Sequence, residues 1–467
     1  MCGITGILAP DKDENIIQEL YDSLFHIQHR GQDSFGMYTY SCKHKRYSHI
    51  KQEGLLANNI SIQKEKLPGN IGIGHVRYPT SGIISCNEIQ PFFVNRPYGI
   101  SLCHNGHIQN KDKLREILIK SNNLYLDTTS DSEIILYLFS IELEKELNDN
   151  SEITNQMIQK VLHNLSLLLQ GSYSIIMIIA GYGIIFFKDK YGIRPLLHGK
   201  RDNNHLISSE SISLDNLDYE FQDVNAGEYG IIDLNGTLHK SYYCDNYSLT
   251  PCIFEWIYIS RIESVIHDIP VIQARFEMGK LLAAKIKENV NLDDIDFIIP
   301  VPETSKPSAL SMSEELNIPY TEGIIKNRYI NRTFIMDSNQ TRNKNIKRKL
   351  NIINSQVNGK NLIIVDDSIV RGNTMRHIVK LLRKNGAEKI IVVSCAPMIK
   401  YANIYGIDVS SHTELISHNH TIHDIEREIG ADKLIYQDLD PLLELFTKLN
   451  PNIKQYETSL FNGIYLK

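Results

Sequence analysis

The chain has 467 residues, of which 42% are hydrophobic and 22% charged, and its formal net charge is −6. This length predicts two domains, and the acidic balance argues against the basic face that nucleic-acid binding requires. The seven cysteines are scattered without a C-x-x-C pair, and no apolar run is long enough to span a membrane. We therefore expect a cytoplasmic protein whose partners include neither nucleic acid nor membrane.

The first half predicts a layered domain of sheets and helices. Helical periodicity predicts one helix within residues 15–31, closed by Gly31, and another over residues 131–147, which opens at Asp131. Short apolar stretches broken by glycine predict strands. These stretches are residues 2–8, 35–40, 70–78, 99–106, 173–189 and 228–234.

The chain opens with Met1-Cys2, at the start of the first predicted strand. Removal of Met1 would give Cys2 a free α-amino group beside its thiol, which places a nucleophile and a weak base on one residue. The alternative is a small apolar side chain packed at a strand end, a common role of free cysteine. The opening residues alone leave both interpretations standing.

Polar segments at strand ends and helix starts supply the residue types that would hold free glutamine. Arg77 can pair with the α-carboxylate, Asp131 can accept from the α-ammonium group, and Asn105–Gly106 can donate to the oxyanion formed when the amide is attacked. Each also has a structural interpretation. Arg77 could form a surface ion pair, Asp131 could cap a helix, and Asn105–Gly106 could form a hairpin turn.

The character of the sequence changes at a polar, turn-rich stretch near residues 241–252, which we interpret as a linker. Beyond it, buried strands alternate with helices, which predicts a doubly wound, mostly parallel sheet. The helix that begins near residue 375 is expected to end at Gly386 and to bury one face. The residues on that face are Met375, Ile378, Val379 and Leu382.

The most specific local signal is the stretch 363–374, where a buried strand runs into Asp366 and Asp367 and a polar turn then leads into a helix. Backbone N–H groups from Ser368 to Thr374 and the positive helix N-terminus would meet a phosphate. The two carboxylates would face sugar hydroxyls and a magnesium ion. The alternative is a strand-turn-helix in which the two acids cap the helix.

This stretch resembles the phosphoribosylpyrophosphate (PRPP) loop of type I phosphoribosyltransferases. Residues 300–309 resemble the pyrophosphate-side loop of that family, and residues 323–335, which include Arg328, resemble its flexible closing loop. A solvated basic face is the alternative for the latter. The resemblance implies one Mg²⁺ per subunit near Thr304, Asp366 and Asp367. The PRPP-binding residues it implies are Lys326, Arg332, Asp366, Asp367, Ser368, Val370, Arg371, Gly372, Asn373 and Thr374.

Residues 1–235 resemble the N-terminal-nucleophile glutamine amidotransferases. In that family the initiator methionine is removed, the cysteine thiol attacks the glutamine amide, and a thioester forms before water releases the enzyme. The resemblance makes Cys2 the nucleophile and Arg77, Asn105, Gly106 and Asp131 the glutamine-binding residues. Because Cys2 already follows Met1, no longer propeptide is expected.

Together the two halves resemble the glutamine PRPP amidotransferase family. The resemblance implies a layered αββα amidotransferase domain over 2–240 and a type I phosphoribosyltransferase domain with a C-terminal extension over 255–467. Glutamine, PRPP and water would give 5-phosphoribosylamine, glutamate and pyrophosphate, the first committed step of purine synthesis. The resemblance also implies inhibition by purine nucleotides and a homo-oligomer, either a dimer or a tetramer.

The chain departs from the family pattern at two site positions. His107 stands where an asparagine is more usual, and Asn373 replaces a threonine in the phosphate loop. Some members hold an iron–sulfur cluster, but a C-terminal C-x-x-C is missing here, so no cluster is expected. The histidine-rich run 417–424 is interpreted as a solvated helix end rather than a metal site.

Two other functions fit parts of the sequence. A hexosamine-forming amidotransferase would share the N-terminal half but would need sugar-isomerase modules instead of the phosphate loop. A PRPP-sensing regulator would share the loop but would not need the residues gathered around Cys2, and it would be expected to carry a basic nucleic-acid-binding module. Neither accounts for both halves.

Overall fold

The computed structural model describes residues 2–58, 66–78, 86–147, 152–327, 350–409 and 411–466. The chain forms two compact units. The first comprises Met1–Cys252 together with Ile404–Asp408, and the second comprises Ile253–Asn403 and Val409–Lys467. The first unit therefore contains five residues that lie far along the chain, inside the range predicted for the second domain.

Two antiparallel sheets form the centre of the first unit. The first sheet has seven strands in the order β11 (Glu220–Asp223), β9 (Leu197–Arg201), β10 (Asn204–Ser208), β1 (Gly3–Leu8), β4 (Ile71–Arg77), β2 (Ser34–Ser41) and β3 (Arg46–Glu53). The second has six strands in the order β13 (Leu238–Tyr242), β12 (Glu228–Asp233), β8 (Gly183–Lys188), β7 (Gly171–Ile179), β6 (Ile100–Ile108) and β5 (Phe92–Val94).

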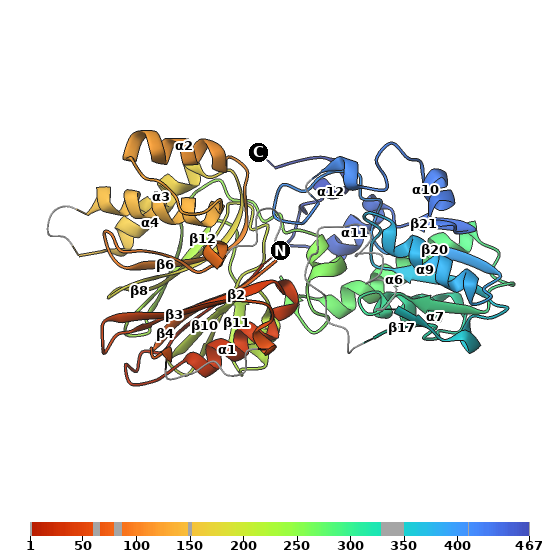
Figure 1. Cartoon of the computed structure of the whole chain (residues 1–467), viewed down its shortest axis with the longest axis horizontal. Helices are drawn as coiled ribbons and strands as arrows, with labels where there is room; N and C mark the ends of the chain where they lie inside the picture. The colour runs from red at the N-terminus through yellow and green to blue at the C-terminus, as the bar shows by residue number, and fades with distance from the viewer. Residues whose placement is uncertain are drawn as a thin grey trace. The chain divides into compact units, whose positions relative to one another are not determined.

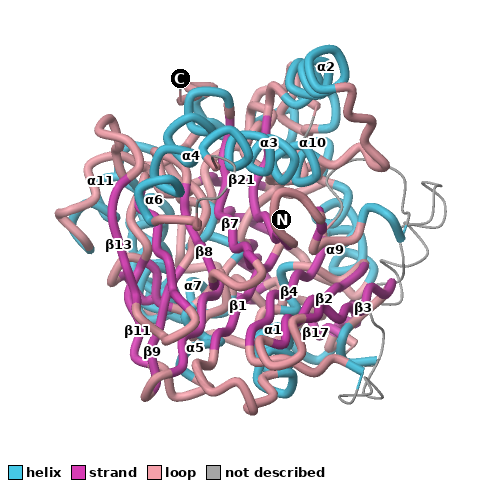
Figure 2. Tube along the Cα trace, turned by 90° about the vertical axis from the view of Figure 1, so that its left-hand side faces the viewer, coloured by secondary structure: helices cyan, strands magenta, loops and turns pink. Residues whose placement is uncertain are grey.

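The sheets stack face to face because successive residues of a strand point to opposite faces and both faces here are apolar. Ile4 and Ile73 of the first sheet share a core cluster with Ile176 and Phe186 of the second. The opposite face of the first sheet packs on α1 (Ile17–His26) and α5 (Ser211–Asp215). Three helices cover the second sheet, namely α2 (Lys111–Asn122), α3 (Asp131–Glu146) and α4 (Asn155–Leu168) (Figures 1 and 2). The predicted αββα layering is confirmed.

A parallel sheet forms the core of the second unit, in the order β16 (Phe297–Pro300), β19 (Asn361–Asp366), β20 (Lys389–Ser394) and β21 (Lys433–Tyr436). One face packs on α9 (Asn373–Lys384) and α10 (Ile422–Ile429). Residues pointing the other way, such as Ile363 and Val393, are also fully buried, since α7 (Lys306–Leu316) packs on β16 and β19, and α6 (Val271–Asn289) packs on α7. The predicted parallel sheet flanked by helices is confirmed.

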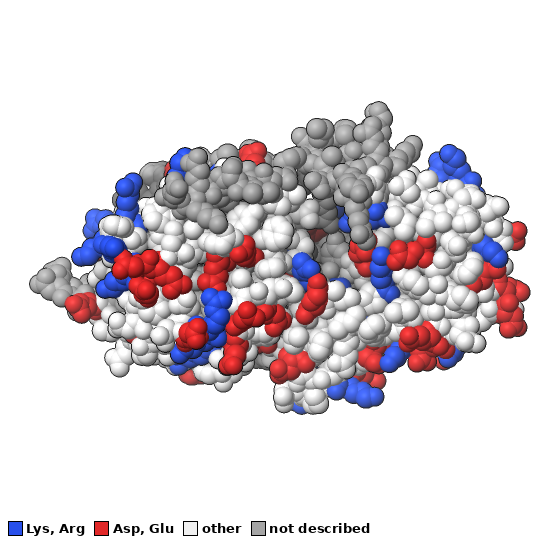
Figure 3. All heavy atoms as spheres, turned by 90° about the horizontal axis from the view of Figure 1, so that it is seen from below, with Lys and Arg blue, Asp and Glu red and all other residues white. Residues whose placement is uncertain are grey.

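Smaller elements complete the second unit. It has two two-stranded pairs, β14 (Val265–Ile266) with β15 (Ile269–Pro270), and β17 (Ile324–Lys326) with β18 (Leu350–Ile352). A π-helical turn covers Glu255–Ile259, and α11 (Leu439–Leu449) and α12 (Ser459–Asn462) lie near the C-terminus. Within the described ranges, no helix is both long and apolar enough to cross a bilayer. Acidic and basic side chains are interspersed on the face shown in Figure 3.

Two local predictions have opposite outcomes. The face predicted for α9 is confirmed, since Met375, Ile378, Val379 and Leu382 are the buried residues of that helix. The prediction that Gly31 caps the first helix is wrong, because α1 ends at His26 and a short 3₁₀ turn follows. Gly31 is extended, and a Cβ there would lie 2.4 Å from the carbonyl carbon of Val76. Gly31 therefore allows two backbone segments to approach closely.

Candidate active site

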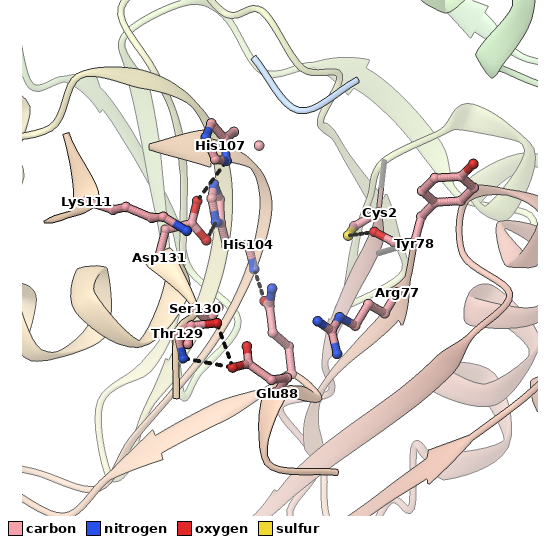
Figure 4. A pocket seen from close by; sticks show the side chains of 12 residues that line it. Cys2, Arg77, Tyr78, Glu88, His104, His107, Lys111, Thr129, Ser130 and Asp131 are labelled. Atoms are coloured by element: carbon pink, nitrogen blue, oxygen red, sulfur yellow. Dashed lines mark hydrogen bonds and ion pairs between the residues drawn. The ribbon is translucent and has the colours of Figure 1, made fainter. Parts of the chain in front are cut away.

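The residues predicted to act on glutamine converge in the first unit from separate elements. Cys2 precedes β1, Arg77 ends β4, Gly106 lies in β6 and Asp131 is the first residue of α3. These four side chains or backbones line one pocket, and Asn105 lies beside Cys2. In Figure 4 the Cys2 thiol and the Arg77 guanidinium lie on one side of the pocket, and Asp131 lies on the other.

Cys2 is held through its backbone. Its nitrogen donates to Asn105 Oδ1 at 3.4 Å, and its carbonyl accepts from Arg30 Nε at 3.0 Å. Arg30 is in turn paired with Glu210 at 2.6 Å, and both side chains are fully buried. The thiol lies 4.0 Å from the carbonyl oxygen of Tyr78. A buried ion pair thus fixes the position of the residue that carries the thiol, and no pattern in the sequence indicated Arg30 or Glu210 as its members.

Asn105 and Gly106 lie within β6, so the hairpin-turn alternative is wrong. The Nδ2 of Asn105 is buried and has no hydrogen-bond partner among the described residues. Gly106 has a φ of +155° and lies against β7, so a Cβ there would be 2.1 Å from the carbonyl oxygen of Ser172. Glycine is required here by the close approach of the two strands, and an unused amide donor points to a ligand oxygen.

Asp131 does not cap α3, since Ser130 is the N-cap residue. Its carboxylate accepts from Ile108 N at 2.9 Å and lies 3.7 Å from His104 Nδ1 and 3.8 Å from His107 Nδ1. Burial alone would raise the pKa of Asp131. The charges of His104 and His107 and the hydrogen bonds from His104 and the Ile108 backbone together outweigh burial and hold the pKa well below its usual range. Asp131 therefore stays ionised.

The same His104–Asp131 pair also shifts the pKa of His104. Burial disfavours its imidazolium, but the Asp131 carboxylate outweighs burial and raises the pKa of His104. For His107 burial prevails and lowers the pKa. His107, one of the two departures from the family pattern, thus lines the pocket as a half-buried imidazole that favours the neutral form.

The pocket has further charged and polar residues that the sequence analysis did not single out. Glu88 accepts from the backbone nitrogen of Thr129 at 2.7 Å and from its hydroxyl at 2.9 Å, and Lys111 lies near Asp131 (Figure 4). Arg77, Lys111, Asp131 and Glu88 thus all line one pocket. Two positive and two negative side chains suit a zwitterionic amino acid, with its carboxylate and its ammonium group.

The acidic pair of the second unit lies at the end of β19. The Asp367 backbone nitrogen donates to Asp366 Oδ1 at 3.0 Å, and Ser368 Oγ donates to Asp367 Oδ1 at 2.8 Å. Burial and the neighbouring Asp367 charge raise the pKa of Asp366, and burial raises that of Asp367. Two desolvated carboxylates side by side favour binding of a cation.

The phosphate loop leads directly into α9. Gly372 is the N-cap residue, and no side chain caps the first turn, so the alternative in which Asp366 and Asp367 cap the helix is wrong. The first amides of α9 are therefore free of a side-chain cap and can meet an anion. Asn373, the second departure, accepts from Arg376 at 2.9 Å, and Arg371 pairs with Glu414.

Thr304 lies in the turn between β16 and α7, half-buried, and Val301 N donates to Val365 O at 2.8 Å. Because β16 and β19 are parallel neighbours, the loops of Thr304 and Asp366 leave the same edge of the sheet. Lys326 is exposed at the end of β17. Arg328 and Arg332 lie outside the described residues.

Family models match both halves. A phosphoribosyl transferase domain matches residues 269–428, and a glutamine amidotransferase domain matches residues 75–216. The amidophosphoribosyltransferase of Escherichia coli is 42% identical over 473 residues, covering 100% of this chain and 92% of its own. The one from Schizosaccharomyces pombe is 38% identical, covering 100% of this chain and 90% of its own.

The chain belongs to the amidophosphoribosyltransferase family. The solved glutamine PRPP amidotransferase of B. subtilis, complexed with ADP and GMP, has a TM-score of 0.85 and 31% identity, covering 99% of this chain and 97% of its own. A second solved structure, described as the allosteric regulatory enzyme of purine biosynthesis, has a TM-score of 0.84 and 31% identity. The predicted family, enzyme class and glutamine-dependent amidotransfer to PRPP are confirmed.

The similarity to amidophosphoribosyltransferases covers the whole chain and excludes the two rival interpretations. A hexosamine-forming amidotransferase would not match a phosphoribosyl transferase model, and a PRPP-sensing regulator would not match a glutamine amidotransferase model. The histidine-rich run fits its interpretation as a solvated helix end. His418, His420 and His423 are exposed, and Thr421 caps α10 among them.

Proposed function

We propose that Cys2, once Met1 is removed, hydrolyses glutamine in the pocket of the first unit. Arg77 would hold the α-carboxylate, Asp131 the α-ammonium group, and Asn105 Nδ2 with the Gly106 N–H the oxyanion. The observation that carries this proposal is the pair of roles open to Asn105. Its Oδ1 holds the Cys2 nitrogen while its buried Nδ2 has no partner among the described residues.

The steps follow from these positions. The Cys2 thiol gives its proton to the α-amino group and its sulfur bonds to the amide carbon, so the carbonyl becomes an oxyanion. The amino group then protonates the leaving nitrogen, and ammonia departs to leave a thioester. Water attacks the thioester carbon, which releases glutamate and restores the thiol.

We assign PRPP to the second unit. The 5′-phosphate would bind the loop from Ser368 to Thr374 at the start of α9, and the ribose hydroxyls would bind Asp366 and Asp367. Ammonia would attack the C1 atom of PRPP, so that a C–N bond replaces the bond to pyrophosphate. Lys326 and Arg332 would neutralise phosphate charge, and the products would be 5-phosphoribosylamine and pyrophosphate.

Asp366 and Asp367, with Thr304 on a loop at the same edge of the sheet, suit a magnesium ion. Carboxylate oxygens are its preferred protein ligands, and Mg²⁺ takes most of its remaining ligands from phosphates and water. Among the described residues no group of three or more His, Cys, Asp or Glu could hold a metal by itself. The substrate would therefore complete the coordination, and the ion would stabilise the negative charge on the departing pyrophosphate.

The finer predictions complete the proposal. The glutamine reaction would occupy residues 2–240 and the phosphoribosyl reaction residues 255–467, in a cytoplasmic homo-oligomer without an iron–sulfur cluster. The solved B. subtilis relative binds ADP and GMP, which supports purine nucleotides as inhibitors here. The reaction would be the first committed step of purine synthesis.

The substitution Cys2→Ala tests the proposal. We expect it to abolish phosphoribosylamine formation from glutamine while the same protein still forms it from ammonia and PRPP. A variant that retains the glutamine route would overturn the role of Cys2. The mass of the purified chain, with or without Met1, gives an independent readout.

A further inference from the structure

A short segment from late in the sequence is part of the first unit. Ile404–Asp408 belongs to that unit, whereas the chain on both sides belongs to the second. The base of the excursion is closed by Asn403 N, which donates to Val409 O at 2.8 Å. The excursion is therefore a short, defined loop.

The carbonyl oxygen of Tyr405 is its anchor. It accepts from Arg194 Nε at 2.9 Å, from Arg194 Nη2 at 2.7 Å and from Ser172 Oγ at 2.8 Å. Tyr405 is 1% exposed, and Arg194 and Ser172 are fully buried. One oxygen that receives three buried hydrogen bonds holds the loop firmly, since each donor would otherwise lose a partner in a dry environment.

The anchored loop reaches the glutamine pocket at Gly106. A Cβ at Gly406 would lie 3.1 Å from the carbonyl oxygen of Gly106 and 3.2 Å from its carbonyl carbon. On the other strand, the carbonyl oxygen of Ser172 lies 3.4 Å from His104 Nε2 and would be 2.1 Å from a Cβ at Gly106. Gly106 is thus contacted both by Gly406 and by the residue that anchors Tyr405.

We propose that Tyr405 and Gly406 are positioning residues of the glutamine site: they hold the backbone of Gly106 so that its N–H meets the oxyanion. The inference rests on the proposed role of Gly106. The Tyr405 carbonyl acts through Ser172 and Arg194, and Gly406 acts by direct backbone contact. Neither residue touches glutamine. The site of the first unit is incomplete without these late residues.

Gly406→Ala tests the proposal in the full chain. Gly406 has a φ of +98°, and the added methyl group would force the Gly106 carbonyl, and with it the Gly106 backbone, to move by a few tenths of an ångström. We expect kcat with glutamine to fall about tenfold or more, because loss of one oxyanion donor costs about 10²–10³ in kcat. KM for glutamine and the ammonia-dependent rate should stay near their original values.

Gly181→Ala is the matched control. Gly181 also lies in the first unit with a positive φ of +77°, but a Cβ there meets nothing within 4 Å. Both variants place an alanine at a positive φ, so a loss of kcat in Gly406→Ala beyond that in Gly181→Ala reports on the contact. Equal losses in the two variants, or an equal loss of the ammonia-dependent rate, would overturn the proposal.

Ser172→Ala provides a second test if Gly406→Ala does not fold. It removes one donor to Tyr405 O and leaves β7 intact, so we expect the same selective loss of kcat with glutamine, smaller in size. Unchanged kinetics would contradict the anchoring role. Cys2→Ala distinguishes a failure of the proposed function from a failure of the positioning role alone. If it keeps the glutamine route, the proposed function fails. If it loses that route while Gly406→Ala matches Gly181→Ala, the positioning role alone fails.

Discussion

Asn105 Oδ1 accepts a hydrogen bond from the backbone nitrogen of Cys2 at 3.4 Å, across 103 positions of sequence. After loss of Met1 that nitrogen would be the α-amino group, so Asn105 would orient the base as well as the oxyanion. The other end of the amide, Nδ2, is buried without a partner among the described residues. One side chain thus faces both groups that the first step requires.

Asn105→Asp separates these two roles. The change keeps an oxygen for the Cys2 nitrogen but replaces the Nδ2 donor with a negative charge beside the oxyanion. We expect kcat with glutamine to fall by about 10²–10³ or more, with the ammonia-dependent rate unchanged. Steady-state kinetics with each nitrogen source measure the effect, and a loss below tenfold would remove Asn105 from the oxyanion site.

Glu210→Gln should destabilise the protein strongly. The buried Arg30–Glu210 pair is 2.6 Å long, and Arg30 also holds the Cys2 carbonyl. Removing one charge of a buried pair costs about 3–5 kcal/mol, measurable as a lower free energy of unfolding in urea. The control is Glu144→Gln, because the pair of Glu144 with Arg96 is exposed and such pairs contribute about 0–1 kcal/mol. Similar effects in both variants would argue against a structural role for the buried pair.

The His104–Asp131 pair predicts a pH dependence of stability. The pKa of His104 is raised in the folded state, so its contribution is complete below the unfolded pKa of about 6.5 and is lost as pH rises through the folded value. His104→Gln removes this contribution. The difference in free energy of unfolding between the original protein and the variant should therefore be larger at pH 6 than at pH 9. A difference that grows with pH would have the wrong sign.

Asp366→Asn should separate activity from stability. We expect phosphoribosylamine formation to be lost with glutamine and with ammonia alike, since both routes use PRPP. The free energy of unfolding without ligands should stay equal or rise, because one of two buried neighbouring carboxylates loses its charge. Added Mg²⁺ and PRPP should raise the melting temperature of the original protein and not that of the variant. Asp440→Asn, at an exposed position in the first turn of α11, is the control and should behave as the original in each assay.

Local patterns in the sequence were sufficient to predict structure where that structure depends on residues close together along the chain. The buried face of α9 follows from helical spacing, and α3 begins at Asp131 as predicted. The end of α1 was predicted wrongly because glycine is a common helix-capping residue. The position of Gly31 is instead set by its contact with β4. A contact between segments 45 positions apart leaves no periodic signal.

The same limit applies to the sites. Residue type, together with the family resemblance, predicted the five residues that lie around the proposed glutamine pocket, since each carries a group that glutamine chemistry needs. The Arg30–Glu210 pair and the anchor at Tyr405 could not be predicted, because a buried arginine and a backbone carbonyl have no sequence signature of their partners. The pairing of Arg371 with Glu414 could not be predicted for the same reason.

The loop at Ile404–Asp408 also bears on whether the two compact units could be encoded by separate genes. The first compact unit is not encoded by one continuous stretch of gene, and the glutamine amidotransferase match at residues 75–216 ends long before the loop. A gene split at the boundary after Cys252 would give a first product without five of its own residues. Fission of the gene into two polypeptides would therefore have to restore that loop by some other means, which ties the two activities to one reading frame.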